Sequence, residues 1–278
     1  MWTKEIIEGQ PPRCQAMTGL PGDQVAELVT AVYGLLGGVW QPVRGRRRVL
    51  GLYRAVVLTL FLMRRNESQA VAGEVFGCSQ ATVSRVTRRL RPSLGQATAG
   101  LAAKVRAQAQ RSAVLVDGFL APTGERTGVA GMFSGKRHQA GFNIQAVADL
   151  DGRLVDTGMP CPGARHDSKA LADSGIAERW AGHLQPGGPG MLADLGYLGT
   201  AAITGTRKPR GRDLTDVQRA CNSSLNRLRA AVERSIAHLV NWKVLDTGWR
   251  GRLTDFPEVL RTVTDLEIYR SWGWSLSE

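Results

Sequence analysis

The chain has 278 residues, of which 43% are hydrophobic and 22% are charged, so it is long enough to bury the core of one large or two modest domains. No apolar run approaches the roughly 18 residues of a membrane span, and no signal peptide pattern opens the chain. The four cysteines lack C-x-x-C spacing, so neither a zinc site nor a disulfide framework is indicated. We therefore expect a reduced, cytoplasmic protein. The chain carries 36 Lys and Arg against 24 Asp and Glu, a net charge of +12.

The positive charge is concentrated in the first part of the chain. Residues 1–111 contain 16 Lys and Arg against 6 Asp and Glu, a net charge of +10. Residues 112–278 contain 20 against 18, a net charge of +2. A generally basic surface gives no reason for this separation. The separation of charge instead predicts a polyanion-binding segment joined to a nearly neutral domain.

Two helices and a basic run are predicted before residue 67. The stretch "GDQVAELVTAVYGLL" (22–36) has apolar residues at helical spacing, and "LGLYRAVVLTLFLMRR" (50–65) is typical of a largely buried helix. Between them, "RGRRR" (44–48) contains Arg46, Arg47 and Arg48. This run is interpreted either as an arm that contacts DNA phosphates or as an ordinary solvated loop.

The stretch "ESQAVAGEVFGCSQATVSRVTRRL" (67–90) predicts a short helix, a turn at Gly77-Cys78 and a second helix that Ser79 caps. Polar side chains project from the second helix away from its apolar side: Gln80, Thr82, Arg85, Arg88 and Arg89. This is the layout of a helix-turn-helix, in which the second helix enters a major groove. Glycine-linked helix pairs also occur in domains that bind nothing, but the charge of this region favours DNA binding.

From residue 112 the pattern changes to strands. The run Ala113–Val116 predicts a buried strand that ends at Asp117, although Asp-Gly is also a strong turn pair. Further strands are expected over 141–149 and 152–160, and a short one from 191 stops at Asp194. Asp167 lies in a loop where it is able to cap a helix. An amphipathic helix is expected over 222–240, with an apolar stripe of Leu225, Leu228, Val232, Ile236 and Leu239.

Five stretches of the second part resemble the DDE transposases. They are "VDG", "FSGKRHQAGFNIQAVADLDGRL", "PGARHDS", "DLGYLG" and "RAAVERSIAHLVNWKVL", and they occur in family order over more than half of the chain. The sequence is most similar to the IS5-type bacterial insertion-sequence group, which is related to the PIF/Harbinger transposases. Arg229 and Glu233 keep the spacing of the group's C-terminal signature, whereas Asn226 and Val240 stand where that signature has Tyr and often has Lys.

The resemblance implies an α/β fold class. An RNase H-like catalytic domain, a mixed sheet flanked by helices, is expected over 112–278, after an all-α DNA-binding region over 1–111 with its helix-turn-helix at about 45–95. Asp117, Asp194 and Glu233 would be the catalytic triad and would hold two Mg²⁺ or Mn²⁺ ions, with Asp167 as a fourth ligand or only a helix cap. Such ions prefer hard oxygen ligands and activate an attacking water or 3′-hydroxyl. From the residues alone, Asp194 also suits a turn and Glu233 a surface pair with Arg229.

The resemblance also implies a function and its partners. Lys136, Arg137 and Arg229 are expected to contact DNA near the site. The protein would be a transposase that binds the terminal inverted repeats of its element, cleaves the strands with a metal ion and transfers them into target DNA, as a homodimer or larger assembly in the bacterial cytoplasm, with the nucleoid. The alternatives are a domesticated transposase that acts as a DNA-binding protein and a non-transposing RNase H-like DNA endonuclease.

Overall fold

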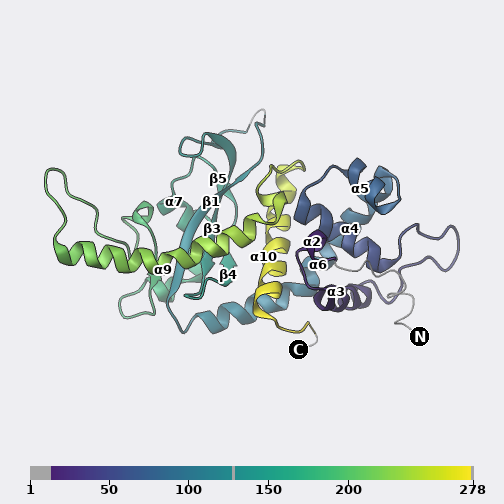
Figure 1. Ribbon diagram of the computed structural model, residues 1–278, viewed down its shortest axis with the longest axis horizontal. Coiled ribbons are helices and arrows are strands. Elements are labelled where there is room, and N and C mark those ends of the chain that lie inside the picture. Colours follow the sequence, from purple (N-terminus) through teal and green to yellow (C-terminus); the bar gives the residue numbers. More distant parts are fainter. Residues whose placement is uncertain (1–13, 127–128, 277–278) are drawn as a thin grey trace. The chain divides into compact units, whose positions relative to one another are not determined.

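The computed structural model describes residues 14–126 and 129–276, and the chain forms two compact units. The helical unit contains the residues up to Leu101, Asn241–Thr247 and the segment from Glu258 onward; the sheet unit contains Ala102–Val240 and Gly248–Pro257. Both are visible in Figure 1. Among the described residues, no helix is long and apolar enough to cross a bilayer. The division into domains at residue 111 stays a prediction.

The helical unit is built around two helices that the sequence predicted. α3 (Gly22–Leu35) and α4 (Leu52–Arg65) form where apolar residues recur at helical spacing, and α4 buries ten of its 14 residues. α4 ends at Asn66, which adopts the left-handed conformation with φ 51° that asparagine tolerates. The short α2 (Gln15–Thr18), η3 (Lys243–Leu245) and most of α10 (Phe256–Trp272) also belong to this unit.

A helix pair joined by a tight turn follows α4. α5 (Gln69–Phe76) is capped by the Ser68 hydroxyl and ends at Gly77, which has φ 65°. Ser79 Oγ then accepts the backbone N–H of Thr82 at 3.3 Å, so it caps α6 (Gln80–Ala109) as predicted. At Gly73 a Cβ would lie 2.6 Å from the Cys78 carbonyl oxygen, so the close return of the chain requires glycine there.

The sheet unit contains a mixed sheet with the strand order β2-β3-β1-β6, and β4 and β5 also pair with β3. The bounds are β1 Val114–Pro122, β2 Phe133–Ser134, β3 Gln139–Ala148, β4 Leu154–Thr157, β5 Cys161–Pro162 and β6 Met191–Leu192. β1 is antiparallel to β3 along its length and parallel to β6. The α/β class and the helical region before it therefore agree with the sequence-based prediction.

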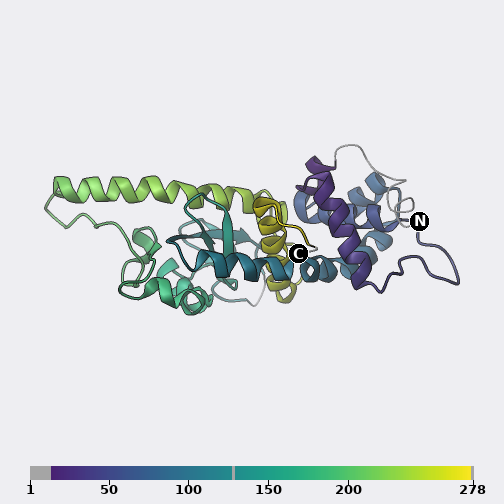
Figure 2. The same ribbon diagram turned by 90° about the horizontal axis from the view of Figure 1, so that it is seen from below.

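Helices surround the sheet and one of them closes its core. The helices and 3-10 turns of this unit are α7 (Asp167–Asp173), α8 (Ile176–Arg179), η1 (Ala181–Leu184), η2 (Leu195–Tyr197), α9 (Asp216–Val240) and η4 (Leu253–Asp255). α9 runs beside the sheet in both ribbon views (Figure 1, Figure 2). Its Ala231 and Val232 pack against Leu115, Ala148 and Leu192 of the strands. The core thus fixes the second half of α9 over β1.

Two local predictions were wrong. Asp117 does not end its strand or start a turn, because β1 continues to Pro122 with Asp117 paired opposite Ala146 of β3. Leu228 is 44% exposed and leaves the expected apolar stripe, whereas Leu225 on the same helix is partly buried against the core. The short strand expected from 191 is present as β6, and Asp194 follows it after one residue and turns the chain into η2.

Candidate active site

Two neighbouring parallel strands bring Asp117 and Asp194 to one place. Asp117 lies within β1, its side chain is 20% exposed, and its Oδ1 accepts the Gly118 N–H at 2.8 Å. Asp194 follows β6 after one residue, and its Oδ1 accepts the Gly196 N–H at 2.7 Å. Because β6 pairs with the start of β1, the two carboxylates emerge from adjacent strands on the same side of the sheet unit.

Asp167 joins them from the first turn of α7. The helix cap is His166, whose Nδ1 faces the Ser168 N–H at 3.4 Å, so Asp167 is not the cap. Instead, Asp167 Oδ1 accepts a hydrogen bond from Asn143 Nδ2 at 2.8 Å. Lys136 Nζ lies 3.9 Å from Asp167 Oδ2, on a side chain that is 74% exposed.

Glycines allow the three carboxylates to approach. A Cβ at Gly118 would lie 2.7 Å from Asp167 Oδ1, and a Cβ at Gly196 would lie 2.8 Å from Asp194 Oδ1 and 3.4 Å from Asp167 Oδ2. Neither position has room for a side chain without displacement of a carboxylate. The space next to Asp117 and Asp194 is therefore filled by carboxylate oxygens rather than by apolar groups.

A buried hydrogen-bond chain orients Asp167. Tyr197 Oη donates to Gln145 Oε1 at 2.6 Å, and Gln145 Nε2 donates to Asn143 Oδ1 at 2.9 Å. Asn143 passes the chain on to Asp167. Burial raises the pKa of Tyr197 well above its ordinary value, and the negative charges of Asp167, Asp117 and Asp194 raise it further, so the phenol stays protonated and is fixed as a donor.

Sequence reasoning missed these three supporting residues. The signal was present, because Asn143 and Gln145 are polar residues at alternate positions of a strand that is otherwise buried. Their partners depend on the pairing of β1 with β3, in which Gln145 lies opposite Gly118.

Arg229 of α9 lies against the aspartates. Its Nη2 donates to Asp117 Oδ2 at 3.2 Å and lies 4.0 Å from Asp194 Oδ2, and its side chain is only 13% exposed. Glu233 lies one helical turn further along α9 and is exposed. The structure thus brings Asp117, Asp167 and Asp194 together with Arg229, and it does not bring Glu233 into contact with them.

The electrostatics of Asp117 follow from this crowding. Burial raises the pKa of its carboxyl above the ordinary value, and the carboxylates of Asp194 and Asp167 also raise it, while the Gly118 N–H and Arg229 lower it. A group of like charges in a partly dry place is unfavourable unless a cation balances it. Arg229 supplies part of that balance.

The donor set suits a hard divalent cation. Carboxylate oxygens on adjacent strands, with an amide-oriented third carboxylate, are the ligand chemistry of Mg²⁺ or Mn²⁺. In the described residues, no three His, Cys, Asp or Glu side chains lie close enough together to hold an ion as they are placed. The guanidinium of Arg229 supplies the positive charge next to Asp117 and Asp194. The residues therefore fit a divalent ion in kind and charge.

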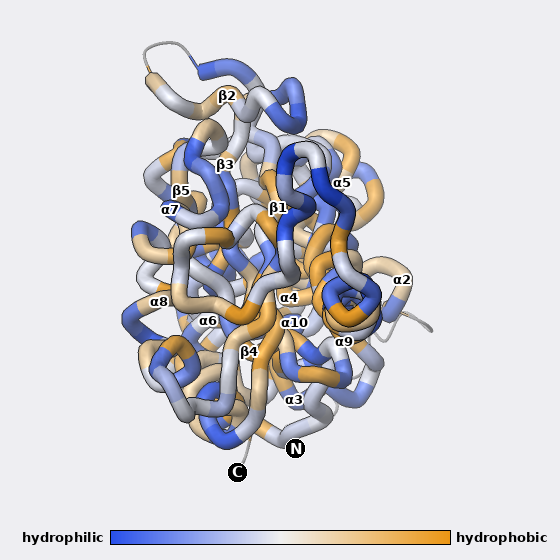
Figure 3. The backbone as a smooth tube through the Cα atoms, turned by 90° about the vertical axis from the view of Figure 1, so that its left-hand side faces the viewer, coloured by the Kyte–Doolittle hydropathy of each residue, from blue (hydrophilic) through white to orange (hydrophobic). Residues whose placement is uncertain are grey.

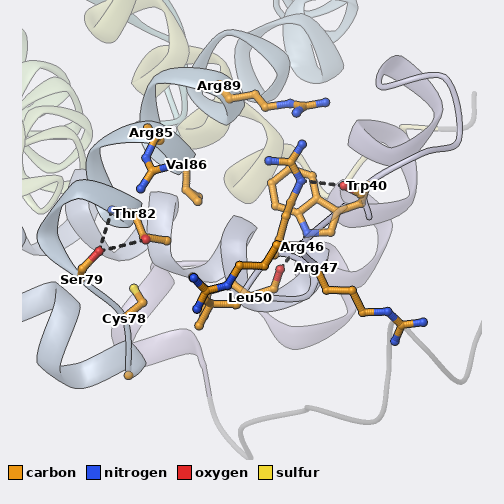
Figure 4. Close-up of a pocket in the computed structure, with 13 residues that line it drawn as sticks. Trp40, Arg46, Arg47, Leu50, Cys78, Ser79, Thr82, Arg85, Val86 and Arg89 are labelled. Carbon is orange, nitrogen blue, oxygen red and sulfur yellow. Dashed lines mark hydrogen bonds between the residues drawn. The ribbon is translucent and has the colours of Figure 1, made fainter. Parts of the chain in front are cut away.

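The predicted basic residues of the helical unit gather around a hollow of about 630 Å³ (Figure 4). Its lining includes Arg46, Arg47, Arg48, Ser79, Thr82, Arg85 and Arg89, whereas Gln80 and Arg88 are not part of it. Thus the "RGRRR" run and the start of α6 face a common space.

Trp40 contacts two of the arginines of this hollow, Arg48 and Arg89. The guanidinium carbon of Arg48 lies 4.8 Å from the centre of the Trp40 ring and that of Arg89 lies 5.4 Å from it. Arg48 Nε also donates to the Trp40 carbonyl at 2.7 Å, and the Trp40 indole donates to the Leu50 carbonyl at 2.8 Å. Burial and the charge of Arg89 both lower the pKa of Arg48. The loop is therefore ordered at its base and suits an anion.

Arg137 does not share the position of Lys136. Its backbone N–H donates to Ser134 Oγ at 3.4 Å, and its side chain is exposed. Both residues lie in the turn between β2 and β3.

Comparison with known proteins assigns the family. A family model described as "DDE superfamily endonuclease" matches residues 116–266. The chain is 30% identical over 243 residues, 86% of its length and 88% of the relative's, to a protein of Streptomyces albus G described as "Putative transposase for insertion sequence element IS112". No solved structure matches. With Asp117, Asp167 and Asp194 all inside the matched region, the chain belongs to the DDE superfamily of endonucleases.

Proposed function

We propose that this protein is an insertion-sequence transposase that binds the terminal inverted repeats of its element, cleaves their strands and joins the 3′ ends to target DNA. The observation that carries the proposal is the gathering of three carboxylates and Arg229 on the sheet of a DDE endonuclease domain. The similarity to a protein described as an IS112 transposase supports the same conclusion. Double-stranded DNA is the substrate, and the active form on DNA is a dimer or a larger assembly.

Asp117, Asp194 and Glu233 are the proposed catalytic triad, with Asp167 as an additional ligand. Bound Mg²⁺ or Mn²⁺ ions would supply a polarised attacking oxygen and a stabilised leaving oxygen. The chain itself holds the carboxylates in place: the β1 and β6 backbones position Asp117 and Asp194, and the Asn143–Gln145–Tyr197 chain orients Asp167. Glu233 lies on the same helix as Arg229, one turn away, so the two side chains are neighbours on α9.

Arg229 has two proposed tasks. Without an ion it balances the charge of Asp117 and Asp194. With DNA present its guanidinium suits a phosphate, which it binds through paired N–H donors. Exchange between these partners would keep the carboxylates neutralised until substrate arrives.

The helical unit is proposed to bind the terminal repeats. α5 and α6 act as a helix-turn-helix, with Gln80, Thr82 and Arg85 toward the bases and Arg46–Arg48, Arg88 and Arg89 toward phosphates. The support is the hollow in which Arg46–Arg48, Arg85 and Arg89 meet. Lys136 and Arg137 are proposed to contact DNA close to the carboxylates.

The decisive experiment is strand cleavage by the purified full chain. The substrate is linear duplex DNA that carries the inverted repeats flanking the gene, with a scrambled duplex beside it, and Mg²⁺ is added or withheld. Asp117→Asn and Asp194→Asn should each abolish cleavage because they remove a ligand charge and keep the shape. Asp151→Asn removes the same charge from a side chain that is 81% exposed and should cleave like the wild type.

Two more substitutions test Glu233, whose role rests on the family resemblance alone, and Asp167, which lies beside Asp117 and Asp194 in the structure. Glu233→Gln should abolish cleavage, and Asp167→Asn should reduce it less. Wild-type cleavage by Asp117→Asn would contradict the proposal, and cleavage without joining or repeat preference would indicate a non-transposing endonuclease instead.

A further inference from the structure

A basic segment of the sheet unit lies outside every site described so far. We call residues 204–227 the basic arm; it consists of the loop "TGTRKPRGRDLT" (204–215) and the first turns of α9. It contains six cationic residues, Arg207, Lys208, Arg210, Arg212, Arg219 and Arg227, against two acidic residues, Asp213 and Asp216. Its net charge is therefore +4, whereas residues 112–278 as a whole carry +2. Without the arm, this part of the chain would be acidic.

Apart from Leu225, which packs against the edge of the core, the arm lies outside the core. None of its residues is buried, and the buried residues of α9 begin at Ala231. Figures 1 and 2 show the loop and the first half of α9 projecting beyond the sheet. In Figure 3, which looks along α9 from this end, the segment that leads into the helix is hydrophilic. The charged side chains of the loop and of the first turns of α9 therefore face solvent rather than the core.

The arm is nevertheless locally ordered. Thr215 and Gln218 form a reciprocal cap: the Thr215 N–H donates to Gln218 Oε1 at 3.0 Å, and the Gln218 N–H donates to Thr215 Oγ1 at 3.2 Å. Asn222 braces the loop, since its Oδ1 accepts the Thr206 N–H at 2.8 Å and its Nδ2 donates to the Thr206 carbonyl at 3.0 Å. The arginines of the loop are therefore presented on a braced hairpin.

Most of the positive charge of the arm is unpaired. Lys208 pairs with Asp213 at 2.6 Å, and Arg219 pairs with Asp216. In the part of the chain that the structure describes, Arg207, Arg210, Arg212 and Arg227 form no ion pair, and all four are exposed. Four unpaired guanidinium groups on a short segment create a strongly positive potential.

The arm leads directly to the carboxylates. An open hollow of about 580 Å³ is lined by Leu214, Arg219, Asn222, Ser223, Asn226 and Arg227. Asn222 and Asn226 fall on the same stripe of α9 as Arg229, at helical spacing. Arg219 is ten residues before Arg229, which is about 15 Å along the helix at about 1.5 Å per residue, or roughly four base pairs of DNA at about 3.4 Å each.

We propose that the basic arm is a second DNA-contact surface, which binds backbone phosphates of the duplex about four base pairs from the reacting phosphate. Arginine forks suit phosphate oxygens, and the Asn222, Ser223 and Asn226 side chains are the amide and hydroxyl groups that also contact DNA backbones. An acidic protein is the less suitable partner, because the arm lies in line with the carboxylates that act on DNA. The inference rests on the proposed function.

The test is the salt dependence of DNA binding by the full chain. Binding to a linear duplex of random sequence is measured over a range of salt concentrations for the wild type and two triple variants. The arm variant is Arg207→Ala, Arg210→Ala and Arg212→Ala. The matched control is Lys104→Ala, Arg111→Ala and Arg261→Ala, which removes the same charge from exposed residues outside both proposed surfaces. Circular dichroism and urea unfolding should be the same for all three proteins, since no substituted residue is buried.

In the arm variant the negative slope of log K against log salt should become shallower by about 0.9 for each lost phosphate contact, so by about two to three units in total. The control should keep the wild-type slope. Equal slopes for the two variants would overturn the inference, as would a wild-type slope for the arm variant. If the wild type cuts DNA and the arm variant binds DNA normally, the inference about the arm fails and the proposed function stands. If the wild type neither binds nor cuts DNA, both the inference and the proposed function fail.

Discussion

Substitution of Gly118 by alanine tests whether the geometry around Asp167 matters. The new Cβ would lie 2.7 Å from Asp167 Oδ1, 2.9 Å from Gln145 Nε2 and 3.2 Å from Asn143 Oδ1. Ordinary contact begins at 3.4 Å, so the Asp167 oxygen must retreat by about 0.7 Å and the Gln145 amide by about 0.5 Å. The backbone at Gly118 has no positive φ, so the strain comes from these contacts alone.

The expected cost has two parts. Movement of the Gln145 amide weakens its hydrogen bonds with Asn143 and Tyr197, and Gln145 is fully buried. Loss of one buried hydrogen-bond partner costs about 1–3 kcal/mol, so the free energy of unfolding should fall by about that amount. Misplacement of a catalytic group by about 1 Å costs roughly a hundredfold, so cleavage should fall roughly ten- to a hundredfold.

Urea unfolding and metal-dependent cleavage of linear DNA measure these two parts separately. Gly182→Ala is the control in the same unit, since a Cβ there meets nothing within 4 Å, and it should change neither quantity. If Gly118→Ala unfolds at the wild-type urea concentration and cleaves at the wild-type rate, the packing of Asp167 against β1 is not part of the site.

Three further predictions concern charge and DNA. Because burial raises the pKa of Asp117, the folded carboxyl binds its proton more tightly than the unfolded one, and its contribution to stability is complete below the ordinary pKa and is lost as the pH rises through the raised pKa. Over that rise in pH, urea unfolding should show that Asp117→Asn gains stability relative to the wild type. A stability difference that stays constant with pH would refute this. Arg229→Gln leaves Asp117 and Asp194 without their cation, so added Mg²⁺ should raise the unfolding temperature more than in the wild type, and equal shifts would speak against a metal at these carboxylates. Arg85→Ala should weaken binding to the terminal repeat more than binding to random DNA, whereas substitution of Arg46–Arg48 should weaken both alike; parallel losses for Arg85→Ala would make this arginine a phosphate contact.

Local patterns made much of the fold predictable. α3, α4 and the turn at Gly77 follow from apolar spacing and caps, and the start of β1 follows from an aliphatic, β-branched run, because these signals lie within a few residues of one another. The gathering of Asp117, Asp167 and Asp194 also agrees with the sequence, although their catalytic role stays a prediction.

Features that depend on distant contacts were not predictable in the same way. The positions of Asn143 and Gln145 against Asp167 require the β1–β3 register and the missing side chain at Gly118. Arg229, and not Glu233, faces Asp117 because the rotation of α9 is set by Ala231 and Val232 in the core. The basic arm was hidden by counting charge over 112–278, where its +4 is offset by the acidic remainder.

The order in which the chain is synthesised has a consequence for the helical unit. Tyr269 Oη donates to the Gln24 carbonyl at 3.2 Å, and the Trp242 indole donates to Glu267 at 3.1 Å, so the unit is completed by residues near the C-terminus. Translation from Leu101 to Glu258 takes about 8–30 s at roughly 5–20 residues per second. During that interval Gln24 of α3 lacks its contact with Tyr269 of α10. A copy of the gene that acquires a frameshift before α10 therefore yields a product without the residues that complete the helical unit.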